Sequence, residues 1–219
     1  MLRSDLRNLV RKQLGETTAA FWSDAELNNW INYAGHDVAA KTLCIHDKGN
    51  LTTVTDVAEY ALLITFPKLL CPLKIYIDPD WIELTRSTMD ELDILFPGWR
   101  SSGSSIPDYY IYEPERNKTI TLYPAPDSSV AGVDHLMVYY AKDFTDVASD
   151  AVDFNSQFLP ILELAIVDWV VATGLETRGY GDKANDKWNK YLGRLASYKI
   201  NLSNQNEPEE IIMKNYRNL

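Results

Sequence analysis

Cysteine is scarce in this sequence, and the shortage excludes a class of small secreted proteins. The 219 residues include only Cys44 and Cys71, which are too few for a disulfide framework and form no C-x-x-C pair. We therefore expect two small buried thiols in a reducing compartment. Because Arg3, Asp5 and Arg7 interrupt any apolar run at the start, we also expect no signal peptide.

Positive charge is in deficit as well. The chain has 21 lysines and arginines against 31 acidic residues, which gives a formal net charge of −10. Tight binding to nucleic acid depends on Lys and Arg side chains that neutralise phosphates. The composition therefore argues against a protein that grips DNA or RNA.

The motifs of common enzyme classes are missing too. The sequence contains no Gly-rich loop followed by Lys-Ser or Lys-Thr, and no G-x-G-x-x-G, G-x-S-x-G or H-E-x-x-H. His36 and His135 have no companion nucleophile. Cys44, His46 and Asp47 could ligate a metal, but no second cluster follows, and a helix end explains His46 equally well. We predict that the protein is not an enzyme and holds no cofactor or metal.

The longest apolar run, residues 158–175, is interrupted by one proline and two acids: Pro160, Glu163 and Asp168. A charge at the centre of a bilayer costs about 3 kcal/mol, so we expect a buried helix and no membrane span. Buried acids usually have partners. Because Glu163 and Asp168 lie on different faces of this helix, we expect salt bridges or a subunit contact rather than acid–base catalysis.

Four acids recur at spacings of three and four residues: Asp143, Asp146, Asp150 and Asp153. The spacing is similar to that of a calcium loop, but the glycine and the closing glutamate of an EF-hand are missing. We predict a solvated acidic linker.

Two short runs rich in aromatic and β-branched residues, 109–113 and 119–123, flank a polar turn. Ile120 and Leu122 alternate with polar neighbours, which is the period of a half-buried strand. Asn117 tolerates the left-handed conformation that the turn requires. The pattern predicts a β-hairpin.

Helical patterns lie on both sides of this hairpin. Residues 2–14, and a segment that opens with a Ser23–Glu26 capping box, predict an N-terminal helical hairpin. Further strands are predicted at 59–66, 73–77, 81–86 and 133–141, a short helix near 88–96, and C-terminal helices at 158–174 and 182–199. The order predicts one α+β domain over residues 1–200, with a central antiparallel β-sheet flanked by the helices.

Four motifs occur along the chain: WSDAELxxWIN at 22–32, ITLYPAP at 120–126, LMVYY at 136–140, and Asp153 ahead of Leu159-Pro160. In this order and at these separations, the chain resembles the head-to-tail adaptor (connector) proteins of tailed bacteriophages. The similarity covers roughly residues 1–200.

The resemblance implies a structural virion protein, made in the cytoplasm of the host bacterium, that forms a ring beneath the portal at the head–tail junction. Such rings, usually dodecamers, bind the portal protein and tail or neck proteins, and they extend the DNA channel. The net charge of −10 suits a channel through which DNA passes without specific binding, because an acidic wall repels the duplex.

The segment 201–219 is polar and then weakly apolar, and we predict an extended, flexible C-terminal tail because it buries too little surface to fold alone. Four side chains near its end are expected to contact the portal or a neighbouring subunit: Ile211, Ile212, Met213 and Tyr216. Two other functions stay open from the sequence. One is a tail-terminator, neck or assembly-chaperone protein, and the more distant one is a small hydrolase that uses the acids of the middle region.

Overall fold

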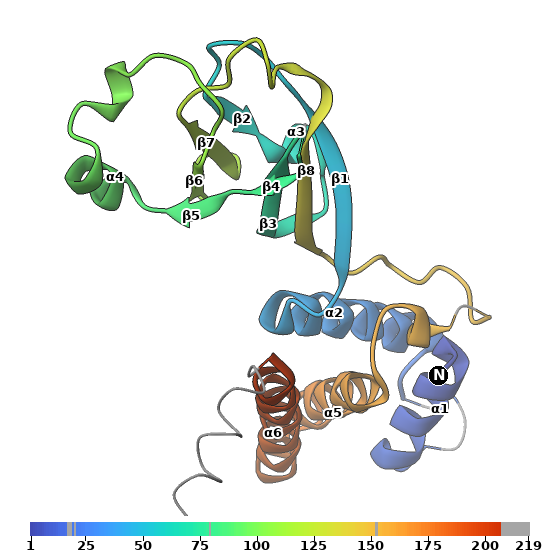
Figure 1. Ribbon diagram of the computed structural model, residues 1–219. Coiled ribbons are helices and arrows are strands. Elements are labelled where there is room, and N and C mark those ends of the chain that lie inside the picture. The colour runs from blue at the N-terminus through green and yellow to red at the C-terminus, as the bar shows by residue number, and fades with distance from the viewer. Residues whose placement is uncertain (17–18, 20, 79, 152, 207–219) are drawn as a thin grey trace, which may run out of the picture. The chain divides into compact units, whose positions relative to one another are not determined.

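The computed structural model describes residues 1–16, 19, 21–78, 80–151 and 153–206, and the chain divides into two compact units (Figure 1). We call Met1–Thr42 with Phe144–Leu219 the helical unit, and Leu43–Asp143 the sheet unit. The sheet unit is therefore an insertion in the sequence of the helical unit. No helix of the described ranges is long and apolar enough to cross a membrane. Our prediction of one domain over 1–200, followed by a flexible tail, stays a prediction.

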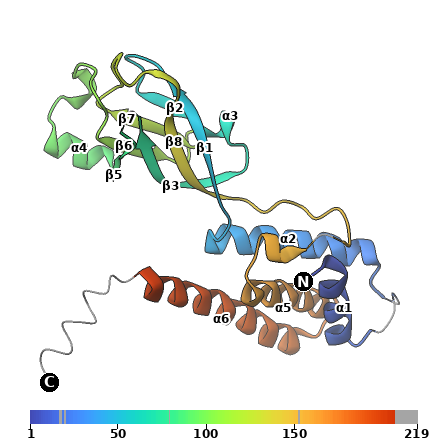
Figure 2. The same ribbon diagram turned by 45° about the vertical axis from the view of Figure 1, so that its right-hand side comes forward.

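Helices build the described part of the helical unit: α1 (Arg3–Leu14), α2 (Asp24–Thr42), α5 (Pro160–Thr177), α6 (Gly181–Asn206) and the short 3₁₀ helix η2 (Phe154–Ser156). The predicted capping box opens α2, because Glu26 N donates to Ser23 Oγ at 3.2 Å and Ser23 N donates to the Glu26 carboxylate at 2.9 Å. Helix α5 packs against α1, α2 and α6 (Figure 2), which explains why its sequence is apolar almost all round.

A phenylalanine cluster holds the segment before α5 against α2. The ring of Phe144 stacks on those of Phe154 and Phe158, with centroids 5.6 and 5.3 Å away. Helix α2 admits the Phe144 ring at Gly35, where an added Cβ would lie 2.7 Å from the ring. This close approach fixes where the chain re-enters the helical unit.

The sheet unit contains eight strands within the described ranges, distributed over two sheets. Their bounds are β1 (His46–Thr53), β2 (Glu59–Ala61), β3 (Leu69–Ile77), β4 (Ile82–Glu83), β5 (Thr85–Ser87), β6 (Tyr109–Glu113), β7 (Thr119–Tyr123) and β8 (Gly132–Lys142). The strand orders are β1-β8-β3-β4 and β2-β7-β6-β5. All pairs are antiparallel except β5 with β6.

Two apolar clusters stabilise the sheet unit. The larger one joins both sheets, with Ile75 and Val138 from the first sheet and Ile120 and Leu122 from the second. The smaller one lies where the short helices α4 (Met89–Leu95) and η1 (Trp99–Ser101) meet β6, and its buried members are Leu92, Trp99 and Ile111. The second sheet is therefore covered by apolar side chains on both faces.

The predicted hairpin is confirmed as β6 and β7, and Asn117 adopts the left-handed conformation with φ of 51°. The expected half-burial of its second strand is wrong. Thr119 and Thr121 are only 7% and 6% exposed, because the smaller apolar cluster covers the face on which they lie.

The α+β class is confirmed, with a helical hairpin before the strands and helices after them. The strands form two sheets where we expected one. The predicted strand at 59–66 ends at Ala61, because the chain turns there into the short helix α3 (Leu62–Thr65). Strand β1 was not predicted, since its sequence HDKGNLTT carries charges and a glycine at an edge of its sheet.

Candidate functional site

Three arginines, Arg3, Arg7 and Arg11, follow one another along α1 at four-residue intervals, which places them on one side of the helix. The side chains of all three are largely buried, with exposed fractions of 10%, 12% and 6%. A buried guanidinium requires a partner. Each of these arginines therefore marks a point where another segment contacts α1.

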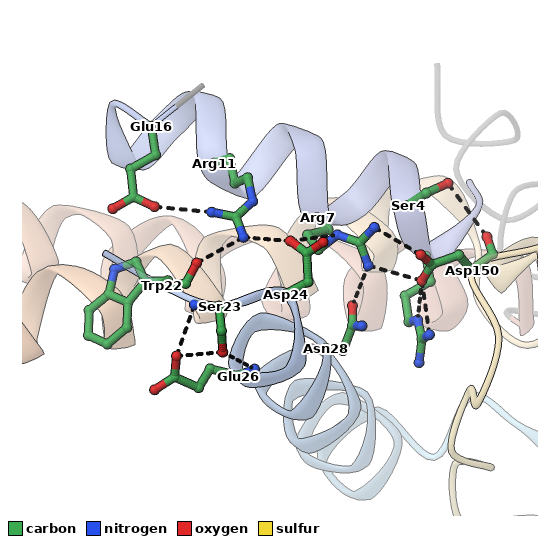
Figure 3. Close-up of polar contacts among 11 residues, drawn as sticks. Ser4, Arg7, Arg11, Glu16, Trp22, Ser23, Asp24, Glu26, Asn28 and Asp150 are labelled. Atoms are coloured by element: carbon green, nitrogen blue, oxygen red, sulfur yellow. Dashed lines mark hydrogen bonds and ion pairs between the residues drawn. The ribbon is translucent and has the colours of Figure 1, made fainter. Parts of the chain in front are cut away.

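Arg11 joins the two helices of the N-terminal hairpin (Figure 3). Its guanidinium donates to the Asp24 carboxylate at 2.6 Å, to the Trp22 carbonyl at 2.9 Å and to the Glu16 carboxylate at 3.1 Å. Arg178, after α5, donates to the second oxygen of Glu16. The two carboxylates and two guanidiniums tie α1, the start of α2 and the end of α5 together.

Arg3 and Arg7 bind the acidic segment that precedes α5. Both donate to the Asp150 carboxylate, Arg3 at 2.9 Å and Arg7 at 2.8 Å, and Arg7 also donates to Asn28 of α2 at 3.0 Å (Figure 3). These hydrogen bonds, first from Arg7 and then from Arg3, hold the pKa of Asp150 below its ordinary value. Asp150 therefore connects this segment to α1, and through Arg7 to Asn28 of α2.

The acids of this segment are solvated, as predicted, but they are also paired, which was not expected. Their side chains keep exposed fractions of 45–66%, but each described acid beyond Asp143 has a partner in the helical unit. Asp146 lies 2.8 Å from His36 Nε2, and Asp153 lies 3.1 Å from the amino group of Met1. The segment is acidic because it packs along helices that present cationic groups.

The two acids inside α5 form salt bridges, as predicted. Glu163 accepts from the amino group of Met1, and its side chain is 2% exposed. Asp168, 3% exposed, accepts from Lys187 at 3.2 Å and from Arg194 at 2.7 Å, both on α6. The carboxylates therefore fix how α5 packs against the start of the chain and against α6.

The candidate metal ligands have separate structural partners. The Nε2 atom of His46 lies 2.9 Å from the Leu43 carbonyl, next to the end of α2, and Asp47 accepts from Lys142 at 2.8 Å. No group of three or more metal-ligating side chains occurs within the described ranges. Cys44 and Cys71 are half-buried where we expected buried thiols, and burial raises the pKa of the Cys71 thiol.

Sequence reasoning missed the arginine series on α1. The signal was present, since three arginines at four-residue spacing lie beside an apolar stripe in a chain that is poor in basic residues. What the spacing could not give is the partner, because Arg3 and Asp150 are 147 residues apart. The predicted contact residues of the tail, Ile211, Ile212, Met213 and Tyr216, lie outside the described residues.

Two exposed surfaces combine apolar and charged side chains. The first, which we call the α4 tip, consists of Asp90, Ile94 and Leu95; Ile94 is 79% and Leu95 60% exposed. The second, which we call the helical groove, is a hollow of about 490 Å³ at the adjoining ends of α1, α5 and α6. Its main lining residues are Leu14, Leu175, Arg178, Tyr180, Lys183 and Lys187.

The fold and these contacts define a structural protein, whose buried charges hold helices together instead of facing a substrate. The chain belongs to the SU10 adaptor protein family, whose model matches residues 1–208. It is thus a bacteriophage adaptor, a component of virion assembly, and this family is not an enzyme family. The resemblance found in the sequence is confirmed at this level. A comparison with curated proteins finds no match.

Proposed function

We propose that the protein forms a ring, a dodecamer, beneath the portal and joins the DNA-filled head to the tail. The family match over residues 1–208 carries this proposal. In this role the adaptor binds the portal protein on one side and tail or neck proteins on the other, and its place is the head–tail junction of the virion.

The distribution of exposed apolar side chains supports a protein with several partners. Ile64, Ile94 and Val133 of the sheet unit are 85%, 79% and 73% exposed, and Tyr33 of the helical unit is 62% exposed. Burying such side chains against another protein removes apolar surface from water, which stabilises the complex. A ring subunit needs such surfaces for its two neighbours and for the proteins above and below it.

The ring extends the DNA channel without binding DNA. The net charge of −10 per subunit is multiplied around a ring, and repulsion acts within a Debye length of the wall, about 8 Å at physiological salt. The basic residues Lys187 and Arg194 of α6 are engaged by Asp168 of the same chain, which leaves them less available to phosphates. A gel shift with duplex DNA at about 0.15 M salt tests this; submicromolar affinity would contradict it.

Mass measurement on the free protein, and on the protein mixed with its portal, tests the ring directly. We expect one mass step per portal that corresponds to twelve subunits. A stable hexamer without portal would instead favour a tail-terminator or neck protein. A monomer that ignores the portal would contradict the ring.

The tail residues Ile211, Ile212, Met213 and Tyr216 are proposed as the portal contact. Truncation after Ser203 tests this. We expect an unchanged melting temperature of the subunit and a loss of portal attachment, because the apolar side chains that dock would be gone. If the truncated protein attaches normally, the portal contact lies elsewhere. If truncation instead unfolds the isolated subunit, the proposal of a tail that orders only on docking is wrong.

A further inference from the structure

The α4 tip is an exposed apolar surface on a firmly held helix. Asp90 and Ile94 are four residues apart and share a face of α4, while Leu92, the buried residue of this helix, packs inward against Trp99. The solvent-exposed side of α4 therefore presents an acid, Asp90, beside two aliphatic side chains, Ile94 and Leu95.

Polar contacts at both ends of α4 hold this helix in place. At its start the Thr88 hydroxyl accepts from Glu91 N at 3.2 Å, and the Glu91 carboxylate accepts from Thr88 N at 2.9 Å. Near its end Asp93 accepts from the indole N–H of Trp99 at 2.8 Å and from Arg100. A preformed surface loses little conformational entropy when it docks.

The helical groove has the opposite character. Its apolar lining comes from Leu14 and Leu175, and Tyr180, 53% exposed, lies at its edge. Three cations surround it: Arg178, which is paired with Glu16; Lys187, which is paired with Asp168; and Lys183. The ammonium of Lys183 lies 5.4 Å from the ring centroid of Tyr180, and no carboxylate within the described ranges pairs with it.

We propose that the α4 tip of one copy docks into the helical groove of the next copy. Ile94 and Leu95 cover the apolar lining of the groove, and Asp90 pairs with Lys183 at its rim. The proposal rests on the proposed ring, and it adds which surfaces form the contact. A ring requires two different, complementary surfaces on each subunit, because a contact of one surface with itself closes a dimer instead.

Charge complementarity is the observation that selects this pair of surfaces. Asp90 of α4 and Lys183 of the groove rim have no ion-pair partner within the described ranges. The other charges are already engaged, because Asp93 is paired with Arg100, Arg178 with Glu16 and Lys187 with Asp168. Rim charges of opposite sign align a contact, and like charges oppose it. The aliphatic side chains then supply the burial that stabilises it.

Charge reversal at the rim, measured on portal-bound rings by mass photometry, tests the contact. We expect Asp90→Lys alone and Lys183→Asp alone each to raise the concentration for half-maximal ring formation by at least about tenfold, since each variant opposes like charges. The double variant Asp90→Lys/Lys183→Asp restores opposite charges, and we expect it to recover most of the lost assembly. Asp80→Lys and Lys199→Asp, which reverse exposed charges elsewhere, are the matched controls and should leave assembly unchanged.

Cross-linking separates a contact between copies from one within a chain. In a background where Cys44 and Cys71 are alanine, we introduce Leu95→Cys and Tyr180→Cys and treat the portal-bound ring with a short bismaleimide. A ladder of covalent multimers on a denaturing gel supports the proposal, and a linked monomer overturns it.

The outcomes also separate this contact from the proposed function. If wild-type rings form but neither charge reversal weakens them, the contact is wrong and the ring stands. If Lys183→Asp leaves the ring intact but abolishes binding of a tail or portal protein, the groove has another occupant and the proposal is overturned. If the wild-type protein forms no ring on its portal, the contact and the proposed function both fail.

Discussion

The helical and sheet units differ in what they bury. Within the described ranges, every buried charged residue belongs to the helical unit: Arg3, Arg11, Glu16, Glu163 and Asp168. The buried polar residues of the sheet unit are all hydroxyls: Thr53, Ser87, Thr119 and Thr121. The sheet unit aligns its strands through ladders of backbone hydrogen bonds and apolar clusters, while the helical unit aligns sequence-distant helices through ion pairs. This difference predicts that the two units respond to different perturbations.

The largest effect should follow from leaving Asp168 without its cations. Replacing Lys187 and Arg194 by methionine keeps much of their volume but leaves a carboxylate that is 3% exposed without a partner. We expect a loss of about 3–5 kcal/mol in the free energy of unfolding, measured with urea, because an uncompensated buried charge is costly. Restoring neutrality with Asp168→Asn in the same variant should recover part of the loss.

The matched control for this pair lies in the sheet unit. Lys74 donates to Glu83 at 3.0 Å, but both side chains are about half exposed, so water already solvates the pair. We expect Lys74→Met to leave the urea midpoint unchanged. If Lys74→Met lowered the free energy of unfolding as much as the replacement of Lys187 and Arg194 does, the contrast between the two units would be wrong.

A cavity in the smaller apolar cluster should affect the sheet unit next most strongly. Leu92 is fully buried, and Leu92→Ala is expected to lower stability by about 2–3 kcal/mol. Hydrogen exchange shows where the loss is felt. Faster exchange in both units would support one cooperative domain over residues 1–200, whereas faster exchange in the sheet unit alone would show that the units unfold separately.

Each unit has a glycine pressed against a phenylalanine, which gives a matched pair of smaller effects. An added Cβ would lie 2.7 Å from Phe144 at Gly35 and 2.4 Å from Phe66 at Gly49. We expect Gly35→Ala and Gly49→Ala each to lower stability by about 1–3 kcal/mol through overpacking. A Cβ added at Gly193 in α6 would meet no other part of the protein within 4 Å. Gly193→Ala should therefore raise stability by about 0.5–1 kcal/mol. The melting temperature of each variant shows whether its stability falls or rises. A Gly35→Ala protein that melts at the wild-type temperature would contradict the close packing of Gly35 against Phe144.

The smallest effect concerns acid. The pKa of Asp150 is lowered by Arg7 and Arg3, so the stability that this pairing contributes is present above the ordinary aspartate pKa of about 3.9. It is lost as the pH falls through the lower pKa of the folded state. We expect Asp150→Asn to flatten the pH dependence of helical-unit unfolding in this acid range. Hydrogen bonds from Ser129 lower the pKa of Asp127 as well, but this residue belongs to the sheet unit, so we expect Asp127→Asn to flatten the pH dependence of sheet-unit unfolding instead.

The elements that were predicted correctly are those determined by interactions between residues close in sequence. The Ser23–Glu26 box, the turn at Asn117 and the periodicity of β7 all act within a few residues, and each is found where expected. The burial of Thr121 was missed because it lies beside Trp99, which reaches the sheet from a separate helix. The alternation of apolar and polar residues along a strand shows which residues share a face. It does not show whether another element of the fold covers that face.

The acidic segment shows the same limit for the site. No local pattern pairs Asp150 with α1, since Asp150 and Arg3 are 147 residues apart, and a solvated linker without partners was the simpler interpretation. The partners of Asp168 were within reach, because Lys187 and Arg194 follow on the next helix at helical spacing. The partner of a charged residue that is distant in sequence can be identified only when the tertiary fold is known.

The insertion of the sheet unit between α2 and the return of the chain at Phe144 has a consequence for synthesis on the ribosome. At about 5–20 residues per second, Asp150 is translated roughly 7–30 s after Arg3. By the end of that interval the whole sheet unit has been translated, while α1 and α2 still lack α5 and α6. The helical groove needs the ends of α1 and α5 and the start of α6, so it cannot form before the start of α6 has been translated. A subunit whose α6 has not yet been translated therefore lacks the groove, and the α4 tip of a neighbouring nascent chain on the same polysome cannot dock into it.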